Sequence, residues 1–203
     1  MSLNKVKGRE SRVESRSADP PSFWHSTLDP RSLTPIPHII RLRGPWQLEP
    51  LQRFVKRSFG GYDGPTSGLP PNDRWTMPAD WCETMGPDFL GVVRYRRTFQ
   101  RPTNLGPRER IWLVVEPPRS CGMVRLNGEF LGYVRFGASA GRFNVTHLLT
   151  TKNSLEIEVE HPELDENDMP LGEGSVHVPG GLVGEVRLEI EEGPEVGGQG
   201  SGD

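Results

Sequence analysis

The stretch VRLNGEFLGY, residues 124–133, decides how this chain folds. In it, Asn127-Gly128 lies between two runs in which apolar and polar residues alternate. A type I′ turn needs positive φ at both central residues, and Asn-Gly between alternating runs is the strongest local signal for such a hairpin. The stretch therefore predicts two antiparallel strands joined by a two-residue turn. A turn carries no chemistry, so the function has to be sought in other residues.

Strand patterns recur along the chain and predict an all-β, antiparallel β-sandwich. The composition agrees, because 24 glycines and 20 prolines suit many short strands joined by turns. Only two stretches, PLQRFVKRSF (50–59) and VTHLLTT (145–151), could be helical. The strand patterns are HIIRLRG (38–44), VRYRRTF (93–99), RIWLVVE (110–116), GMVRLNG (122–128), EFLGYVRF (129–136), NSLEIEVEH (153–161) and GEVRLEIEE (184–192).

The 203 residues predict one folded domain with polar ends. Residues 1–37 form a charged, Pro- and Ser-rich arm, residues 38–192 the β-sandwich, and residues 193–203 a Gly-rich, acidic tail. Both ends lack the apolar content to order themselves, so we expect them to be disordered. The first residues show no apolar signal segment and no run could span a bilayer, so we expect a cytoplasmic protein without membrane contact.

Charge is distributed unevenly along the chain, although the net charge is only −3. Residues 59–153 carry 12 basic and 8 acidic side chains, whereas residues 154–203 carry 1 and 14. The arginines of the middle part alternate with apolar residues, which is typical of a solvated sheet face and argues against nucleic-acid binding.

Cysteine and histidine spacing predicts neither a metal site nor a cofactor. Cys82 and Cys121 lie far apart and read as two reduced thiols. His161 and His177 have no His or Cys partner nearby, so we interpret both as surface histidines.

The order of several motifs resembles the jelly-roll, galactose-binding-domain-like sugar-binding domain of family 2 glycoside hydrolases. The resemblance covers roughly residues 40–190 and implies a sugar-binding module that stands without the catalytic barrel. It rests on RWTMPADW (74–81), GVVRYRRTFQRP (91–102), RIWLVVEPP (110–118), VRLNGEFLG (124–132), GRFNVTHLL (141–149), NSLEIEVEHP (153–162) and PGGLVGEVRLEI (179–190).

Two positions depart from the family pattern. In the enzymes that resemble this chain, the domain lends a polar residue and an acidic residue to the neighbouring catalytic barrel. The corresponding places here are Val92 and Gly184-Glu185, so the first group is absent and the second is altered.

Aromatic and polar side chains give four ligand-binding candidates, Trp75, Trp81, Arg94 and Glu185. Sugars bind to aromatic faces beside hydrogen-bonding groups, and Trp75 follows Asn72, Asp73 and Arg74 in a Pro- and Gly-rich loop, which makes it the best candidate. Tyr95 and Tyr133 could also supply flat faces. For Trp81 and Tyr95 we favour packing in the core, because each flanks an apolar strand.

We expect no catalytic residue. Glycoside hydrolysis needs two carboxylates held by a rigid scaffold, and a (β/α)₈ barrel alone takes about 250 residues. The row Glu156, Glu158 and Glu160 has strand spacing and reads as one solvated face. The chain is therefore interpreted as a noncatalytic carbohydrate-binding module. The alternative is a protein-interaction scaffold that lost the sugar, or an accessory subunit of a glycosidase. The partner is accordingly a carbohydrate or a protein, and the oligomeric state stays undetermined.

The first and last strand patterns, residues 38–44 and 184–192, show the same alternation of apolar and charged residues and carry mainly opposite charges. We expect these strands to lie side by side, with Arg41 and Arg43 next to Glu189 and Glu191 on the solvent face. Ile40 and Leu42 would then point into the core.

Overall fold

The computed structural model describes residues 36–64, 66–81, 85–86, 88–167, 169–171 and 180–193. The chain divides into two units, residues 1–34 and 35–203, and everything described belongs to the second. The predicted N-terminal arm, apart from its last two residues, and the tail after Gly193 lie outside the described residues, as do Cys82 and His177. No described helix has the length and apolar character needed to cross a membrane.

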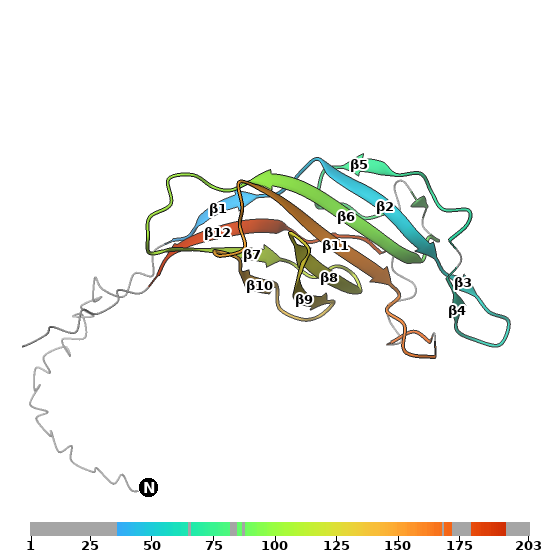
Figure 1. The fold of residues 1–203 in the computed structure, drawn as a ribbon. Helices are drawn as coiled ribbons and strands as arrows, with labels where there is room; N and C mark the ends of the chain where they lie inside the picture. The colour runs from blue at the N-terminus through green and yellow to red at the C-terminus, as the bar shows by residue number, and fades with distance from the viewer. Residues whose placement is uncertain are drawn as a thin grey trace, which may run out of the picture. The chain divides into compact units, whose positions relative to one another are not determined.

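The fold is an all-β jelly-roll sandwich of antiparallel strands, as the sequence predicts (Figure 1). One sheet has the order β1-β12-β7-β10, the other β5-β2-β6-β11-β8-β9, and β3 and β4 form a separate hairpin. The strands are β1 (His38–Arg41), β2 (Trp46–Arg53), β3 (Val55–Lys56), β4 (Tyr62–Asp63), β5 (Asp73–Trp75), β6 (Gly91–Gln100), β7 (Glu109–Val115), β8 (Cys121–Leu126), β9 (Glu129–Arg135), β10 (Gly141–Asn144), β11 (Lys152–His161) and β12 (Val186–Glu192).

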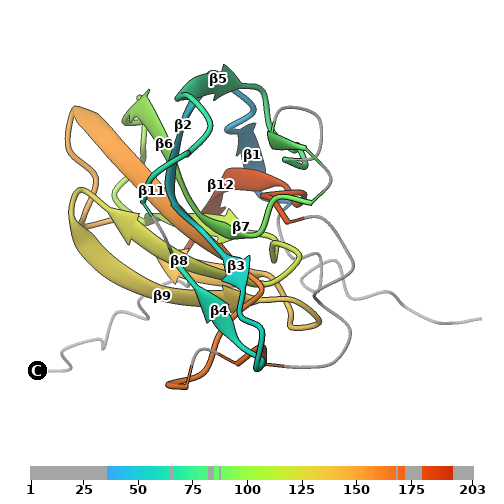
Figure 2. The same cartoon turned by 90° about the vertical axis from the view of Figure 1, so that its right-hand side faces the viewer.

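Alternation along the strands places one core between the two sheets. In Figure 2, β11, β8 and β9 of the six-stranded sheet lie on the left, and β1 and β12 of the four-stranded sheet lie on the right. Every second residue of β11 is buried, including Leu155, Ile157 and Val159, and β12 contributes Leu188 from the opposite layer. Because the strands bury one face each, burial of apolar area stabilises the sandwich.

The helix proposed for residues 50–59 is wrong. Residues 46–53 form β2, in which Trp46, Leu48 and Pro50 alternate into the core. Pro50 has no N–H to donate, and the register with β6 shifts between Pro50 and Gln52, as expected where proline sits in a strand. The helix proposed for residues 145–151 is also wrong, because Val145 only starts a turn, in which its carbonyl accepts the N–H of Leu148.

The hairpin predicted from Asn127-Gly128 is present between β8 and β9. Asn127 has φ 52° and Gly128 φ 90°, so both central residues have the positive φ of a type I′ turn. Asn127 also holds the turn to β11, since its Oδ1 accepts the N–H of Ser154 at 2.9 Å. The side chain therefore links three strands in addition to adopting the left-handed conformation.

Replacing Gly128 by valine is expected to lower the free energy of unfolding by about 1–3 kcal/mol, because a β-branched residue is strained at positive φ. An added Cβ at Gly128 would meet nothing within 4 Å, so the cost comes from the backbone and not from a clash. Urea denaturation measures it, with Gly106→Val as the control at a glycine without positive φ. Equal stability of the Gly128→Val variant would contradict the type I′ assignment.

The first and last strands pair as expected, but the ion pairs differ. β1 and β12 are antiparallel neighbours, and Leu42 is buried just after β1. Arg41 lies opposite Arg187, however, and its Nε donates to Glu185 at 2.6 Å. The prediction that Arg41 contacts Glu189 is wrong because Glu189 lies opposite Ile39, two residues earlier in the strand.

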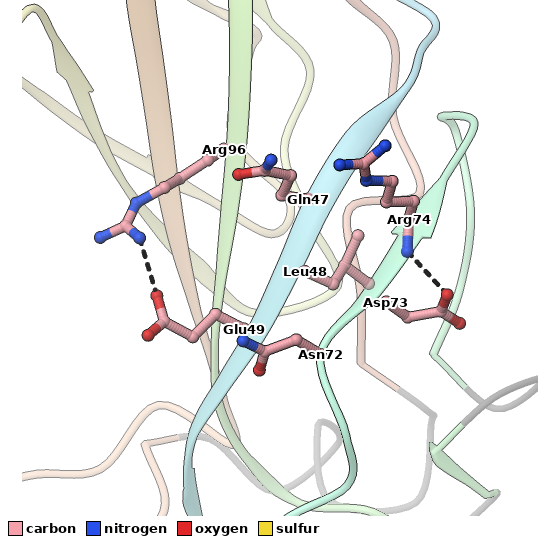
Figure 3. A pocket seen from close by; sticks show the side chains of 7 residues that line it. All are labelled: Gln47, Leu48, Glu49, Asn72, Asp73, Arg74 and Arg96. Carbon is pink, nitrogen blue, oxygen red and sulfur yellow. Dashed lines mark hydrogen bonds and ion pairs between the residues drawn. The ribbon is translucent and has the colours of Figure 1, made fainter.

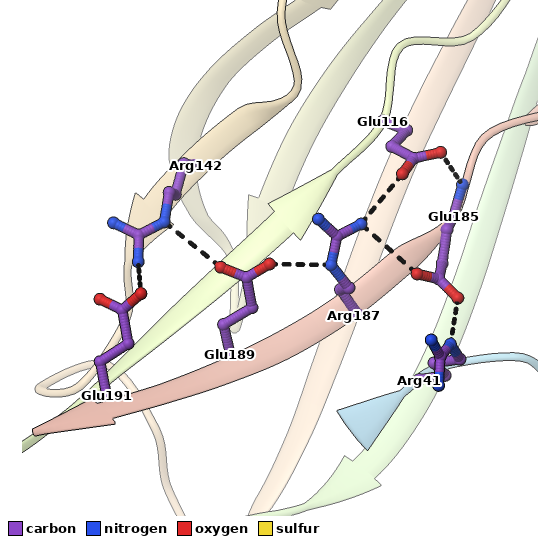
Figure 4. Close-up of polar contacts among 7 residues, drawn as sticks. All are labelled: Arg41, Glu116, Arg142, Glu185, Arg187, Glu189 and Glu191. Atoms are coloured by element: carbon purple, nitrogen blue, oxygen red, sulfur yellow. Dashed lines mark hydrogen bonds and ion pairs between the residues drawn. The ribbon is translucent and has the colours of Figure 1, made fainter. Parts of the chain in front are cut away.

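Glu189 and Glu191 of β12 bond instead to an arginine of β10. Arg142 reaches Glu189 at 3.4 Å and Glu191 at 2.5 Å (Figure 4). Its guanidinium also lies 4.0 Å from the ring centre of Trp112. Arg43, the other predicted partner, is exposed and makes no ion pair with any described residue. The side-chain contacts on the charged face of the four-stranded sheet therefore join β12, β7 and β10, and do not lie mainly between β1 and β12.

Candidate functional site

The four residues predicted to bind a ligand lie at four different places. Trp75 ends β5 at the edge of the six-stranded sheet, and Arg94 lies on the outer face of β6. Trp81 is fully buried, whereas Glu185 precedes β12 in the four-stranded sheet. They form no common site.

Trp81 belongs to the core. Its side chain is 0% exposed, and its ring packs edge-on against Phe89 at 5.3 Å and against His161 at 6.0 Å between ring centres. A fully buried ring cannot stack on a sugar, so the assignment of Trp81 as a ligand-binding residue is wrong. The surface position proposed for His161 is wrong too, because His161 is 0% exposed at the end of β11. Tyr95 is fully buried as favoured, and burial raises its pKa.

Arg94 is held by carboxylates from both neighbouring strands. Its guanidinium lies 2.8 Å from Glu158 and 3.7 Å from Glu156 of β11, and 3.2 Å from Glu49 of β2. Burial lowers the pKa of Arg94, but the hydrogen bond to Glu158 and the three negative charges outweigh it and raise the pKa. With three carboxylates around it, Arg94 has little capacity left for a ligand.

The row of glutamates on β11 is more heterogeneous than its spacing suggests. Glu156 and Glu158 bond to arginines, but Glu160 is half-buried and accepts the N–H of Leu164 at 3.1 Å. Burial raises the pKa of Glu160, so the expectation of one solvated face is wrong at this residue.

Glu185 lies in the charged face of the four-stranded sheet. Besides Arg41, it contacts Arg187 at 3.4 Å, and its N–H donates to Glu116 at 2.9 Å (Figure 4). Arg187 also bonds to Glu116 and Glu189. These contacts give Glu185 a role in ordering the chain before β12.

A polar hollow lies beside Trp75, where β2, β5 and β6 adjoin. It has a volume of about 460 Å³ and includes Asn72, Asp73 and Arg74. The sequence placed these residues in a loop, but Asp73 and Arg74 belong to β5. Gln47 pairs with Arg74 on one side and with Arg96 on the other, which brings the three strands to the hollow. Its lining residues are Gln47, Leu48, Glu49, Asn72, Asp73, Arg74 and Arg96 (Figure 3).

Asp73 is an acceptor of the hollow that two hydrogen bonds orient. Its Oδ2 accepts the indole N–H of Trp75 at 2.9 Å and its Oδ1 the backbone N–H of Arg74 at 2.7 Å. The hydrogen bond from Trp75, and then that from Arg74, lower the pKa of Asp73, so the carboxylate stays ionised at neutral pH. Each oxygen keeps acceptor capacity for a second donor. Trp75 therefore supports the hollow by positioning Asp73.

The other charged residues of the hollow differ in whether they already form ion pairs. Glu49 bonds to Arg94 and Arg96, so its carboxylate is already engaged. The Arg74 guanidinium, in contrast, forms no ion pair with any residue that the structure describes. The hollow thus presents one oriented carboxylate, one unpaired guanidinium and two amides, Gln47 and Asn72. Donors and acceptors at this density suit a ligand rich in hydroxyl groups.

Gln47, Glu49 and Arg96 were missed as site residues for a definite reason. β2 was partly interpreted as a helix, so its partners could not be assigned. The alternation of Trp46, Leu48 and Pro50 in WQLEP was the available signal.

Comparison with known proteins supports the fold. No protein-family model and no curated protein matches this sequence. Solved structures do match it, including the FMN-binding β-glucuronidase of Faecalibacterium prausnitzii L2-6, which is 25% identical with a TM-score of 0.58. That match covers 76% of this chain and 22% of the enzyme.

Two further structures agree in fold at lower identity. The β-glucuronidase of Bifidobacterium dentium, solved with coumarin-3-O-glucuronide, is 20% identical with a TM-score of 0.57 over 77% of this chain and 30% of the enzyme. A protein of Bacteroides fragilis that is described as a β-galactosidase is 19% identical with a TM-score of 0.53. That match covers 78% of this chain and 24% of the other protein. The chain thus spans less than a third of these proteins and shares the fold of the part that it matches.

Proposed function

We propose that this chain is a noncatalytic carbohydrate-binding module, related to the sugar-binding domains of family 2 glycoside hydrolases, and that the hollow around Asp73 is its sugar site. The observation that carries the proposal is the carboxylate of Asp73, fixed by the indole N–H of Trp75 and the backbone N–H of Arg74 in a hollow that is also lined by the Arg74 guanidinium, which has no ion-pair partner among the described residues. A fixed carboxylate can accept two hydroxyl donors of one sugar ring, and a guanidinium can donate to ring or hydroxyl oxygens.

The similarity to structures of β-glucuronidases and a β-galactosidase selects the probes. Methyl β-D-glucuronide is the first, because its carboxylate would also complement Arg74, and methyl β-D-galactoside is the second. We propose that the chain binds without hydrolysing its ligand, so the corresponding nitrophenyl glycosides serve as a negative control in the same preparation.

Isothermal titration with these glycosides is expected to show saturable binding that depends on Asp73. Asp73→Ala removes a charged acceptor, which contributes about 1.5–3 kcal/mol, so affinity falls about tenfold or more. Trp75→Ala is expected to weaken binding by roughly 1 kcal/mol or more, through loss of the hydrogen bond that orients Asp73. Asp63→Ala, which removes an exposed carboxylate on β4, is the matched control and should leave affinity unchanged.

The alternative function, a protein-interaction scaffold that lost the sugar or an accessory subunit of a glycosidase, is favoured by exposed aromatic side chains on β9. No saturation with any of the glycosides would reject the sugar site in favour of this alternative. Binding that persists in Asp73→Ala would move the site away from the hollow.

A further inference from the structure

Three large aromatic side chains are exposed along β9 and the turn after it. Phe130 is 49%, Tyr133 52% and Phe136 72% exposed, and the rings of Phe130 and Tyr133 contact each other at 5.3 Å between centres. Two guanidiniums lie over these rings, Arg125 at 5.7 Å from Phe130 and Arg135 at 5.0 Å from Tyr133. We call these five residues the aromatic edge. Exposed aromatic and arginine side chains together are the composition that protein interfaces favour.

A second surface, which is acidic, is formed by the residues after β11. Residues 163–167 and 169–171, here called the acidic loop, include Glu163, Asp165 and Glu166 and expose Met169 (44%) and Leu171 (50%). The loop is ordered by its own contacts, because Asp165 Oδ1 accepts the N–H of Met169 at 2.9 Å and the Leu171 N–H donates to the carbonyl of Glu163 at 2.8 Å.

The aromatic edge and the acidic loop adjoin each other. Arg135 Nε lies 3.0 Å from Glu163, and Ser120 joins both surfaces, since its hydroxyl accepts the N–H of Glu163 and its carbonyl the N–H of Phe136. In Figure 2 the loop after β11 lies below β9, on the same lower side of the sandwich.

Each surface has a charged side chain that forms no ion pair with a described residue. Glu163 bonds to Arg135, and Asp165 holds the loop. Glu166 and Arg125 make no ion pair with a described residue. The guanidinium of Arg125 donates to the sulfur of Met123 and lies over the ring of Phe130.

We propose that these two surfaces bind a second copy of this chain across a two-fold axis. In a two-fold dimer each surface of one copy meets the complementary surface of the other, so adjacent basic-aromatic and acidic-apolar surfaces complement themselves. Arg125 of one copy faces Glu166 of the other, while Met169 and Leu171 cover the rings of Phe130 and Tyr133. The contact is made by side chains and not by strand addition, because the register shift between β8 and β9 at Val124/Arg125 interrupts the free edge of β9.

Sedimentation velocity on the full chain tests the dimer. A monomer–dimer equilibrium is expected between about 1 and 200 μM, and the double variant Phe130→Ser/Tyr133→Ser should weaken it at least about tenfold. Arg125→Glu and Glu166→Lys should each weaken it as well, whereas the combined Arg125→Glu/Glu166→Lys variant should recover it, because the two charges are exchanged. Ile36→Ser, which removes a 93% exposed apolar side chain before β1, is the matched control.

All of these substitutions lie on the surface, and circular dichroism confirms that each variant folds. Monomeric behaviour over the whole concentration range would overturn the proposal. So would a dimer that is insensitive to Phe130→Ser/Tyr133→Ser, or a charge-exchanged variant as weak as its single parents. None of these outcomes depends on sugar binding, because Asp73 and Trp75 are unchanged throughout.

Discussion

Replacing Trp81 by alanine is expected to lower the free energy of unfolding by about 3–5 kcal/mol, which is a large fraction of the stability of a domain of this size. The indole is completely buried and contacts Phe89 and His161. Gly180 closes over it so tightly that an added Cβ there would fall 1.9 Å from the indole. The backbone around Gly180 cannot fill the space that the indole leaves without moving, so a cavity remains.

Chemical denaturation of Trp81→Ala measures this loss, with Trp75→Ala as the control. Trp75 is only partly buried at the end of an edge strand, so its removal should cost clearly less stability. A loss below about 1 kcal/mol for Trp81→Ala would contradict its place in the core. In the titrations, folded Trp81 variants should retain sugar affinity while Trp75 variants lose it.

The sequence predicted those elements whose pattern is local. Asn127-Gly128 specified the hairpin because a two-residue turn depends on its own φ angles. β6, β11 and β12 were found because every second residue faces the core, a periodicity that needs no knowledge of the partner strand. Part of β2 was interpreted as a helix because Leu51, Phe54 and Val55 are also spaced like one face of a helix. Only the pairing of β2 with β5 and β6 decides between strand and helix.

Side-chain partners could not be predicted, because they depend on register between distant strands. Arg94 meets Glu49 and Glu158 only because β6 lies between β2 and β11. Arg41 does not contact Glu189 because the two strands are antiparallel. Glu189 therefore lies opposite Ile39, near the beginning of β1, whereas Arg41 at its end lies opposite Arg187. The residues before Trp75 were recognised as polar, but the other wall of the hollow comes from β2 and β6, whose place beside β5 the sequence did not show.

Replacing Gly91 by alanine is expected to destabilise the fold by about 3 kcal/mol or more, because the new methyl group has no room. Gly91 begins β6 and pairs with Arg53 of β2 and with His161 of β11. An added Cβ would lie 2.1 Å from the carbonyl oxygen of Gln52, a backbone atom that cannot rotate away, and φ there is 156°.

The clash at Gly91 also reaches the hollow, because it pushes β2 away from β6 and β2 carries Gln47 and Glu49. We therefore expect Gly91→Ala to lower both the unfolding free energy, measured by urea denaturation, and the affinity for a glycoside. Gly106→Ala is the control, since its Cβ would make only an ordinary contact at 3.6 Å with a side chain. If Gly91→Ala were as stable as Gly106→Ala, β2 and β6 could not be joined in the observed register, and the hollow would lose the wall that brings Glu49 and Arg96 to Asp73.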